Sequence, residues 1–413
     1  MSTSFAIGWR QVGATLMLLA AAGMIAATYS IIAVPLSAEF QPSRTMLMLA
    51  MTVLSGASAL LSPLLGGWMD RLSLRVMMVC GGVLLASGYF AISCATSFNA
   101  VLIIFAVMIA PANILLGPVA MTVLLSRWFS RRRGRAIGIA IAGISVGGFF
   151  FPMIIQSLLN AHPWREALQW LALVLLVWTL PAAMLVVNRP EDRGLHADGD
   201  AAPPEAVDEP AQESMTSARE ILSDPAFWML AVTVAIVTAG MKGMITNLAP
   251  MVVDNGYAAA DAAPLISLFA ACSFAAKMSF AALADRLGLR VLMFAALGGF
   301  AVGLACLTQA SLGYQIVLVG VAITGLFGGL MIPVESYVAP RIFGKQAVGR
   351  AMGLLTGTVL IGLLATPPLF GLIFDLFGSY RGIFWTFSGF ALLALLWLPR
   401  IPLHQRERVA GGQ

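Results

Sequence analysis

The chain has 413 residues, of which 60% are hydrophobic and only 10% carry a charged side chain. A soluble globular domain is about one-quarter charged, so this chain has too few charges to cover a surface in contact with water. Side chains that face lipid must be apolar, and the composition therefore indicates a membrane protein. The net charge of +5 does not indicate nucleic-acid binding, because the basic residues lie in short loops and not on one soluble face.

Apolar runs of membrane-spanning length follow one another along the chain. A membrane helix needs about 20 consecutive apolar residues. Because similar runs continue to the end of the chain, the first one is interpreted as an uncleaved membrane helix and not as a signal peptide. We predict an all-α membrane protein with twelve transmembrane helices in two six-helix, pseudo-symmetric halves, at approximately 12–34, 46–68, 75–97, 101–125, 135–157, 166–187, 226–249, 262–284, 290–310, 314–336, 349–373 and 381–399.

The interval 188–222 separates the first six runs from the last six. It is rich in proline, alanine and acidic residues and contains no apolar run, which is typical of a flexible linker. We therefore divide the chain into an N-terminal half (1–187), a linker (188–222) and a C-terminal half (223–413).

The distribution of basic residues predicts the orientation in the membrane. Nineteen arginine and lysine residues fall on the side that holds both termini, whereas the opposite side holds only Arg44, Arg165 and Arg381. Positive residues are enriched in cytoplasmic loops, so both termini and the linker are predicted to be cytoplasmic. The short loops are typical of a bacterial protein, which would place the chain in the inner membrane. The two remaining cations, Lys242 and Lys277, fall inside membrane runs.

One short pattern occurs in both halves. GGWMDRLSLR (66–75) follows the second run and ALADRLGLR (282–290) follows the eighth. The recurrence indicates an internal duplication, and transporters built from such repeats bind substrate near the bilayer midplane and rock one half against the other. Charges at helix ends that exchange partners would form a gating latch, the alternative being ordinary solvated turn charges. The candidate gating residues are Asp70, Arg71, Arg75, Asp285, Arg286, Arg290 and, from a neighbouring loop, Arg133.

Two glycines four residues apart occur in the fifth run, within GISVGGFFFP (143–152). Small residues at this spacing allow two membrane helices to approach closely. The pattern therefore predicts that Gly143 and Gly147 pack against a neighbouring helix.

Together these features resemble the major facilitator superfamily. A narrower resemblance is to the monocarboxylate transporters and their oxalate/formate-exchanger relatives. It rests on Gly8-Trp9 and on three longer segments: WFSRRRGRAIGIAIAGISVGG (128–148), VESYVAPRIFGKQAVGRAMGL (334–354) and PPLFGLIFDLFGSYR (367–381).

The resemblance assigns a role to Lys277. The family holds the substrate carboxylate with an arginine in the eighth helix, eight residues before the aspartate of the second loop motif, and Lys277 occupies that position. Arginine binds a carboxylate with two parallel hydrogen bonds, whereas lysine is a point charge. Animal members carry an aspartate at the position of Ser273 and a lysine in the first helix, and both are absent here. Substrate identity and proton coupling therefore do not follow from the resemblance.

Ionisable residues inside a membrane run are costly and usually face a cavity or a partner. Lys277 and Lys242 are candidates to bind an anionic substrate. The alternatives are a structural ion pair for Lys277 and an extended conformation towards the membrane surface for Lys242. Gly240 and Gly243 flank Lys242 and would leave room for a substrate or a backbone. Glu335 has three possible interpretations: a proton carrier, an ion-pair partner of Lys277, or an ion-pair partner of Arg341 at the cytoplasmic mouth. We favour the last interpretation.

Three neutral polar residues are further candidates. Tyr29, Asn113 and Asn247 lie in the first, fourth and seventh runs, and helices one, four, seven and ten line the cavity in the superfamily. Each is a candidate to hydrogen-bond a carboxylate, the alternative being a bond between helices.

We therefore predict a secondary transporter of a small organic anion, a mono- or dicarboxylate, working by alternating access with a proton gradient or exchange as the energy source. The alternatives are export of a drug or other hydrophobic compound and a membrane sensor that binds a ligand without moving it. No phosphate-binding loop for ATP, no catalytic set and no metal-ligand cluster is present in the sequence, so an enzyme, a cofactor and a metal are not expected. The expected partners are the anion, the coupling proton and the lipid bilayer, and resemblance to the superfamily implies a monomer.

Overall fold

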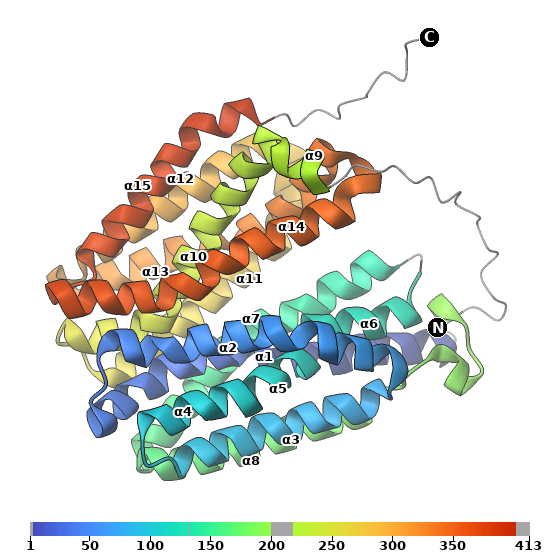
Figure 1. The fold of residues 1–413 in the computed structure, drawn as a ribbon, viewed down its shortest axis with the longest axis horizontal. Coiled ribbons are helices and arrows are strands. Elements are labelled where there is room, and N and C mark those ends of the chain that lie inside the picture. The colour runs from blue at the N-terminus through green and yellow to red at the C-terminus, as the bar shows by residue number, and fades with distance from the viewer. Residues whose placement is uncertain (1–2, 131, 200–217, 402–413) are drawn as a thin grey trace. The chain divides into compact units, whose positions relative to one another are not determined.

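The computed structural model describes residues 3–130, 132–199 and 218–401, and these residues form helices and short connections without any β-strand (Figure 1). Twelve of the helical segments are long and apolar enough to cross a membrane. This confirms the predicted fold class and the predicted number of spans. The chain is a multi-pass membrane protein.

The first six spans are built from nine helical elements. The fourth span is divided into several of them, whereas each of the others is one helix. The elements are α1 (Thr3–Phe40), α2 (Arg44–Arg71), α3 (Leu74–Ser93), α4 (Phe98–Ile104), the π-helical turn η1 (Phe105–Ile109), α5 (Ala110–Leu116), α6 (Pro118–Trp128), α7 (Arg133–Ala161) and α8 (Trp164–Met184), where α4 to α6 make up the fourth span.

The last six spans follow the short helix α9 (Ala218–Ser223). Their connections include short 3₁₀ turns, among them η4 (Ala259–Asp261). The spans lie in α10 (Pro225–Asp254), α11 (Ala262–Leu287), α12 (Leu289–Leu307), α13 (Tyr314–Gly329), α14 (Met331–Phe377) and α15 (Arg381–Trp397).

The helix α14 differs from the sequence prediction. It includes the end of the tenth span, the whole eleventh span and the connection that we expected to interrupt them near residues 337–348. The helix runs through this connection although it contains Pro340 and Gly344, which disfavour a helix interior.

The chain divides into two compact units. Unit 1 comprises Met1–Asp208 together with Ile245–Ala270, and unit 2 comprises Glu209–Met244 together with Ala271–Gln413. The end of α10 and the beginning of α11 thus pack with the first six spans. The division of the chain into two halves and a linker stays a prediction.

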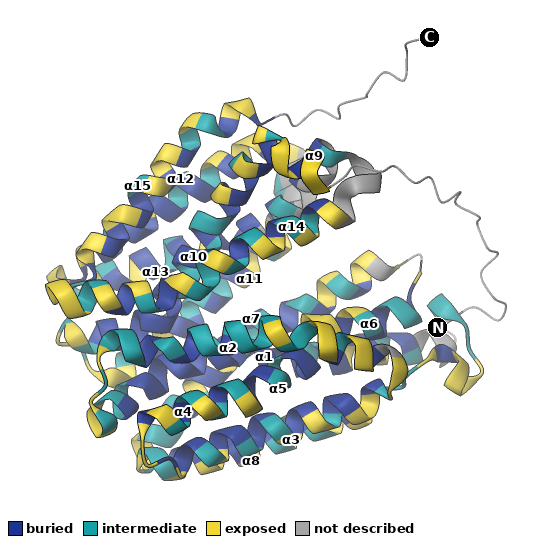
Figure 2. Cartoon of the chain, in the orientation of Figure 1, coloured by how far each residue is buried: buried dark blue, intermediate teal, exposed yellow. Residues whose placement is uncertain are grey.

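Burial follows the pattern of a membrane bundle (Figure 2). Apolar side chains fill the interior of each unit, and many large apolar side chains are also exposed, including Leu60 at 83% and Phe377 at 73%. Soluble monomers rarely expose so many large apolar side chains. In a bilayer these residues face lipid, where exposure costs nothing.

The predicted glycine contact in the fifth span is confirmed. A side chain at Gly143 or Gly147 would collide with the backbone carbonyls of Leu16 or Ala20 in α1. Gly23 makes the reciprocal approach, because a side chain there would collide with the backbone of Ile144 in α7. The backbones of α1 and α7 are therefore in direct contact, which larger residues would prevent.

Arg165 and Arg381 repeat one structural role in the two halves. Arg165, near the start of α8, donates to the carbonyls of Ser93 and Ala95 at the end of α3, at 2.8 and 2.9 Å. Arg381, at the start of α15, donates to the carbonyl of Thr308 at the end of α12, at 2.8 Å. Each arginine satisfies carbonyls that have no partner within their own helix. These contacts tie the sixth span to the third and the twelfth to the ninth.

Part of the predicted linker makes specific contacts in unit 1. Asn188 accepts a hydrogen bond from the backbone of Arg75 at 2.9 Å, and Asp198 accepts bonds from the backbones of Ser130 and Arg132. Residues 188–199 are therefore attached to the ends of membrane helices, which the composition did not predict. Residues 200–217 lie outside the described part of the chain.

The contact between α1 and α7 predicts the effect of enlarging Gly147. Gly147→Leu should lower the thermal unfolding midpoint of the detergent-purified protein, since overpacking a tight contact costs about 1–3 kcal/mol. Gly138→Leu is the matched control, because Gly138 lies in the same helix at an exposed position with no atom within 4 Å of the added Cβ. Fluorescence-detected unfolding measures both. Equal midpoints would contradict a packing role for Gly147.

Candidate functional site

The fourth span is interrupted at two points around Asn113. The π-helical turn η1 precedes α5, and the span breaks again at Gly117, which has an extended backbone, before Pro118 begins α6. A side chain at Gly117 would collide with the carbonyl of Asn113, so glycine is required there. Irregular backbone within a membrane span occurs where it is buried in protein or lines a cavity. Short π-helical turns are frequent at functional sites.

The tenth span has only a mild irregularity at the corresponding place. The helix α13 ends at Gly329 and α14 begins at Met331, while Leu330 between them keeps a helical backbone and donates to the carbonyl of Phe327. The fourth and tenth spans hold the same place in their respective halves. Glycine- or proline-interrupted segments in corresponding positions of two repeats indicate a transporter's binding site. The sequence signals, Gly117-Pro118 and Gly328-Gly329, were visible but not recognised in the sequence analysis.

The glycine pair at the end of α13, Gly328 and Gly329, adjoins both lysine-bearing helices of unit 2. A side chain at Gly328 would contact Met241 of α10, the residue before Lys242. A side chain at Gly329 would lie 2.8 Å from the Cα atom of Ser273 in α11, one turn before Lys277. The segments that carry the two predicted lysines therefore both pack against the glycine pair. Both lysines are half-buried and both interact with other residues.

The close approach at Gly329 accounts for Ser273. The Ser273 side chain is buried, and its Oγ atom would lie 2.9 Å from a Cβ atom at Gly329. A small residue fits this contact between α11 and α13, whereas a larger charged residue would force the helices apart. A small residue therefore suits the position of Ser273.

The glycines beside Lys242 have a different role from the one expected. The space at Gly240 is occupied by the rings of Phe300 and Phe387. The space at Gly243 is occupied by Phe370 and Thr366. These glycines accommodate aromatic packing within unit 2 and leave no room there for a substrate.

The three neutral polar candidates, Tyr29, Asn113 and Asn247, all lie in unit 1. The Tyr29 hydroxyl, which is fully buried, donates to the carbonyl of Leu47, and its ring meets Phe105 edge-on at 5.3 Å. These contacts favour the helix-bonding interpretation of Tyr29, and they support the π-helical turn that begins at Phe105. Asn247 is buried in the part of α10 that belongs to unit 1.

Asn113 is the neutral candidate that remains most open to a ligand. It lies half-buried in α5 between the two interruptions of the fourth span. Among the residues whose side chains the structure describes, none forms a hydrogen bond with its amide. The amide offers both a donor and an acceptor.

The two copies of the repeated loop are held by different local contacts. In the first copy, the Ser73 hydroxyl caps α3, and Arg127 donates to the carbonyl of Met69 near the end of α2 at 2.9 Å. In the second copy, Gly288 takes that position with a φ of 78°, a left-handed conformation that favours glycine.

The latch expected at these loops stays a prediction. The side chains of Arg71, Arg75, Arg286 and Arg290 are exposed. Those of Asp70, Arg133, Asp285 and Arg341 lie outside the described part of the structure. Glu335 is half-buried in α14, so its pairing with Arg341 is likewise a prediction.

The aromatic pair of the 128–148 signature anchors a loop. Trp128, which is buried, donates from its indole nitrogen to the carbonyl of Val187 at 2.9 Å. Phe129 packs edge-on against Trp9 at 5.6 Å, in a space left open by Gly8. The signature thus fixes the end of the fourth span against the first and sixth spans.

Sequence reasoning also missed an ion pair. Arg44 at the start of α2 contacts Asp254 at the end of α10 at 2.6 Å, with side chains that are 16% and 18% exposed. The two residues are 210 positions apart, so no local pattern indicates the pairing. Among the described residues, no cluster of histidine, cysteine or acidic side chains could hold a metal ion.

Comparison with known proteins agrees with this architecture. The chain matches the family described as the Major Facilitator Superfamily over residues 14–275 and again over residues 233–413. It is 26% identical to monocarboxylate transporter 12-B of Danio rerio over 79% of this chain and 72% of that protein. It is 28% identical to monocarboxylate transporter 13 of Rattus norvegicus over 80% of this chain and 74% of that protein.

A solved structure shares the fold. It is the crystal structure of a bacterial homologue of the human lysosomal transporter Spinster, in an inward-facing and occupied conformation. It superposes with a TM-score of 0.68 over 94% of this chain and 95% of that chain, at 16% sequence identity. At this identity the likeness establishes the fold alone.

The difference between the repeated loops predicts unequal tolerance to substitution. Gly288→Ala should destabilise the purified protein by about 1–2 kcal/mol, because a left-handed conformation strains any residue with a Cβ atom. Gly353→Ala is the control, since Gly353 is exposed in α14 with nothing within 4 Å of the added atom. Gly353→Ala should leave the stability of the protein unchanged or increase it. Denaturation in detergent tests both, and a Gly288→Ala protein as stable as wild type would refute the strain.

Proposed function

Because the chain belongs to the Major Facilitator Superfamily and is a membrane transporter rather than an enzyme, we propose that it carries small organic anions, mono- or dicarboxylates, by alternating access. The observation that carries the proposal is the convergence of two lysine-bearing segments on the glycine pair at the end of α13. A cation inside a membrane span is costly unless it has a partner or a function.

We assign the substrate carboxylate to Lys277. The side chain is half-buried, and its segment packs through Ser273 against Gly329. A carboxylate would add a charge-assisted hydrogen bond to the ammonium group, and such bonds are about twice as strong as neutral ones. Lys242 would assist, because Gly328 packs against the residue beside it. A second cation suits a second carboxylate, so Lys242 is the candidate that separates dicarboxylates from monocarboxylates.

The relatives support this choice of substrate class. Both relatives described above are named monocarboxylate transporters. Lys277 replaces the arginine that the resemblance implies, so a positive charge is kept while the two-pronged geometry is lost. We propose that neutral groups such as the Asn113 amide compensate by accepting or donating hydrogen bonds to the anion.

The proposal also covers the energy source for transport and the orientation of the chain in the membrane. Uptake or release of the anion would be driven by a proton gradient or by exchange for a second anion. The charges of the two repeated loops, with Asp70 and Asp285 at their centres, would act as the cytoplasmic latch. The excess of basic residues on the side of the termini supports a cytoplasmic location for both ends, in a bacterial inner membrane.

Replacing Lys277 should abolish carboxylate binding. A ligand present at 100 times its Kd stabilises a native protein by about 2.7 kcal/mol, which is visible as a rise in melting temperature. We expect at least one small carboxylate to stabilise the wild type and Lys277→Arg but not Lys277→Ala. Lys242→Ala should lose stabilisation by dicarboxylates while retaining that by monocarboxylates. A thermal-shift screen of the detergent-purified proteins measures this.

Met278→Ala is the matched control for that screen. Met278 lies next to Lys277 in α11 and is exposed, so the variant should respond to carboxylates as the wild type does. An equal response of wild type and Lys277→Ala would remove Lys277 from the site. Stabilisation by hydrophobic compounds in place of carboxylates would instead favour the export function.

A further inference from the structure

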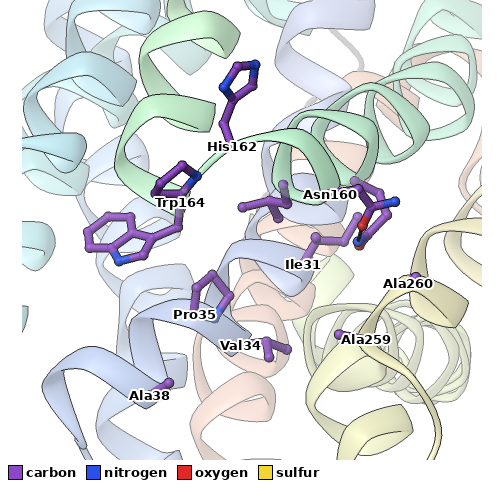
Figure 3. Close-up of a pocket in the computed structure, with 12 residues that line it drawn as sticks. Ile31, Val34, Pro35, Ala38, Asn160, His162, Trp164, Ala259 and Ala260 are labelled. Atoms are coloured by element: carbon purple, nitrogen blue, oxygen red, sulfur yellow. Dashed lines mark hydrogen bonds between the residues drawn. The ribbon is translucent and has the colours of Figure 1, made fainter.

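A cavity of about 420 Å³ lies in unit 1, between the end of α1, the end of α7, the start of α8 and the turn η4 (Figure 3). Pockets that bind small molecules measure about 300–1,000 Å³. The residues that line this cavity belong to unit 1, whereas Lys242 and Lys277 belong to unit 2. The cavity therefore has the size of a small-molecule site, and it is built from other elements than the region assigned above to the substrate anion.

Flat rings form part of the cavity wall. The indole of Trp164 and the pyrrolidine rings of Pro35 and Pro163 line the cavity. Figure 3 shows Pro35 and Trp164 on the side opposite Ala259 and Ala260. Flat apolar walls fit a flat apolar ligand, because stacked faces bring many atoms to van der Waals distance at once. The lining thus favours a ligand with an aromatic body.

The charge of the lining restricts the ligand further. None of the described residues that line the cavity is a lysine, an arginine, an aspartate or a glutamate. The nearest guanidinium, that of Arg165, already donates to the carbonyls of Ser93 and Ala95. It also pairs with Glu39 and stacks on the Trp164 ring at 4.3 Å. A charged ligand would lose its hydration in the cavity without gaining a partner, so the lining selects an uncharged molecule.

Three polar side chains line the cavity, and two of them form a pair. The Gln156 amide donates to the Asn160 side-chain oxygen at 2.9 Å, and within the described part of the chain the two amides form no other hydrogen bond. This bond leaves one amide oxygen as an acceptor and one amide nitrogen as a donor. The third, His162, faces the Glu166 carboxylate at 3.5 Å and so has a partner of its own. The amide pair therefore matches a ligand group that both donates and accepts.

We propose that this cavity binds an uncharged aromatic amide or alcohol. The flat body lies between the ring walls and the two alanines of η4, and the polar group exchanges hydrogen bonds with Gln156 and Asn160. The site differs in chemistry from the one proposed for the substrate, because an anion requires a cation such as Lys277 and this lining offers none. The inference therefore does not depend on the substrate class.

Two probes of equal size test the selection against charge. Benzamide is uncharged, whereas benzoate has the same ring and carries a negative charge at neutral pH. Saturation-transfer NMR is recorded on the protein in lipid nanodiscs, with empty nanodiscs as the reference. Benzamide should bind with a Kd of about 1 mM, as expected for so small a ligand, and an excess of benzoate should not displace it. Displacement by benzoate, or a signal equal to that of empty nanodiscs, would overturn the proposal.

Filling the cavity locates the bound probe. Ala259→Trp places a large ring inside the cavity and should weaken benzamide binding about tenfold or more, because a close-packed site has no room for both rings. Ala258→Trp is the matched control, since Ala258 is exposed next to Ala259 and does not line the cavity. Thermal unfolding midpoints verify that both proteins are folded. Unchanged binding in Ala259→Trp, or an equal loss in the two variants, would contradict this location.

The amide pair is tested by removing one member. Asn160→Leu should weaken benzamide binding about three- to tenfold, the contribution of one hydrogen bond, while binding of toluene, which has no polar group, should not weaken. Ser157→Leu is the control, because Ser157 is exposed in the same helix and does not line the cavity. It should leave the binding of both probes unchanged. An equal loss of benzamide and toluene in Asn160→Leu would refute the pairing.

Lys277→Ala separates this site from the substrate proposal. The variant should lose its response to carboxylates and still bind benzamide with wild-type affinity. Loss of benzamide binding in Lys277→Ala would assign the probe to the lysine and overturn the second site. If no carboxylate binds the wild type, the proposed substrate fails, while the benzamide measurements still decide the cavity.

Discussion

The structure depends on one constraint, which is that the bilayer provides no hydrogen bonds to an exposed backbone. Continuous helices meet this constraint, and most of the spans are built from one helix. The fourth span contains a π-helical turn and a break at Gly117. Where irregular backbone persists at membrane depth, packing against other helices must compensate for it. Tyr29 against Phe105 buries the start of the π-helical turn in protein.

The arginines at the helix ends and the lysines inside the spans have different roles. Arg165 and Arg381 neutralise carbonyls at the ends of α3 and α12, and the same solution occurs in both halves. Such contacts complete the helices and set which spans lie together. Lys242 and Lys277 lie within spans, where no helix end requires a cation. Their charge is therefore explained by a ligand or by a specific partner, and the convergence of their segments on Gly328 and Gly329 favours a shared role.

Sequence reasoning succeeded where a property is local or repeated. Apolar length predicted twelve spans, and the spacing of Gly143 and Gly147 predicted a close contact, because both follow from neighbouring residues alone. The same reasoning did not predict the pairing of Arg44 with Asp254, since nothing links two positions 210 residues apart before the chain folds. It misjudged Gly240 and Gly243, because the rings that fill the space beside them come from distant helices. The candidate site residues are consequently predicted from the sequence by their type, and the structure adds their surroundings.

The two halves share the arginine contacts that join their helices, but they differ in how the repeated loop is stabilised. The arginine that joins the sixth span to the third recurs between the twelfth and the ninth. The repeated loop is instead capped by a hydroxyl at Ser73 and turned by a left-handed backbone at Gly288. A side-chain cap adds a hydrogen bond to the native state, whereas glycine removes a steric penalty from one conformation. The two halves thus keep the same arginine contact where it joins two helices. The loops that the repeat places at corresponding helix ends have diverged, because a hydroxyl cap stabilises one turn and a positive-φ glycine the other.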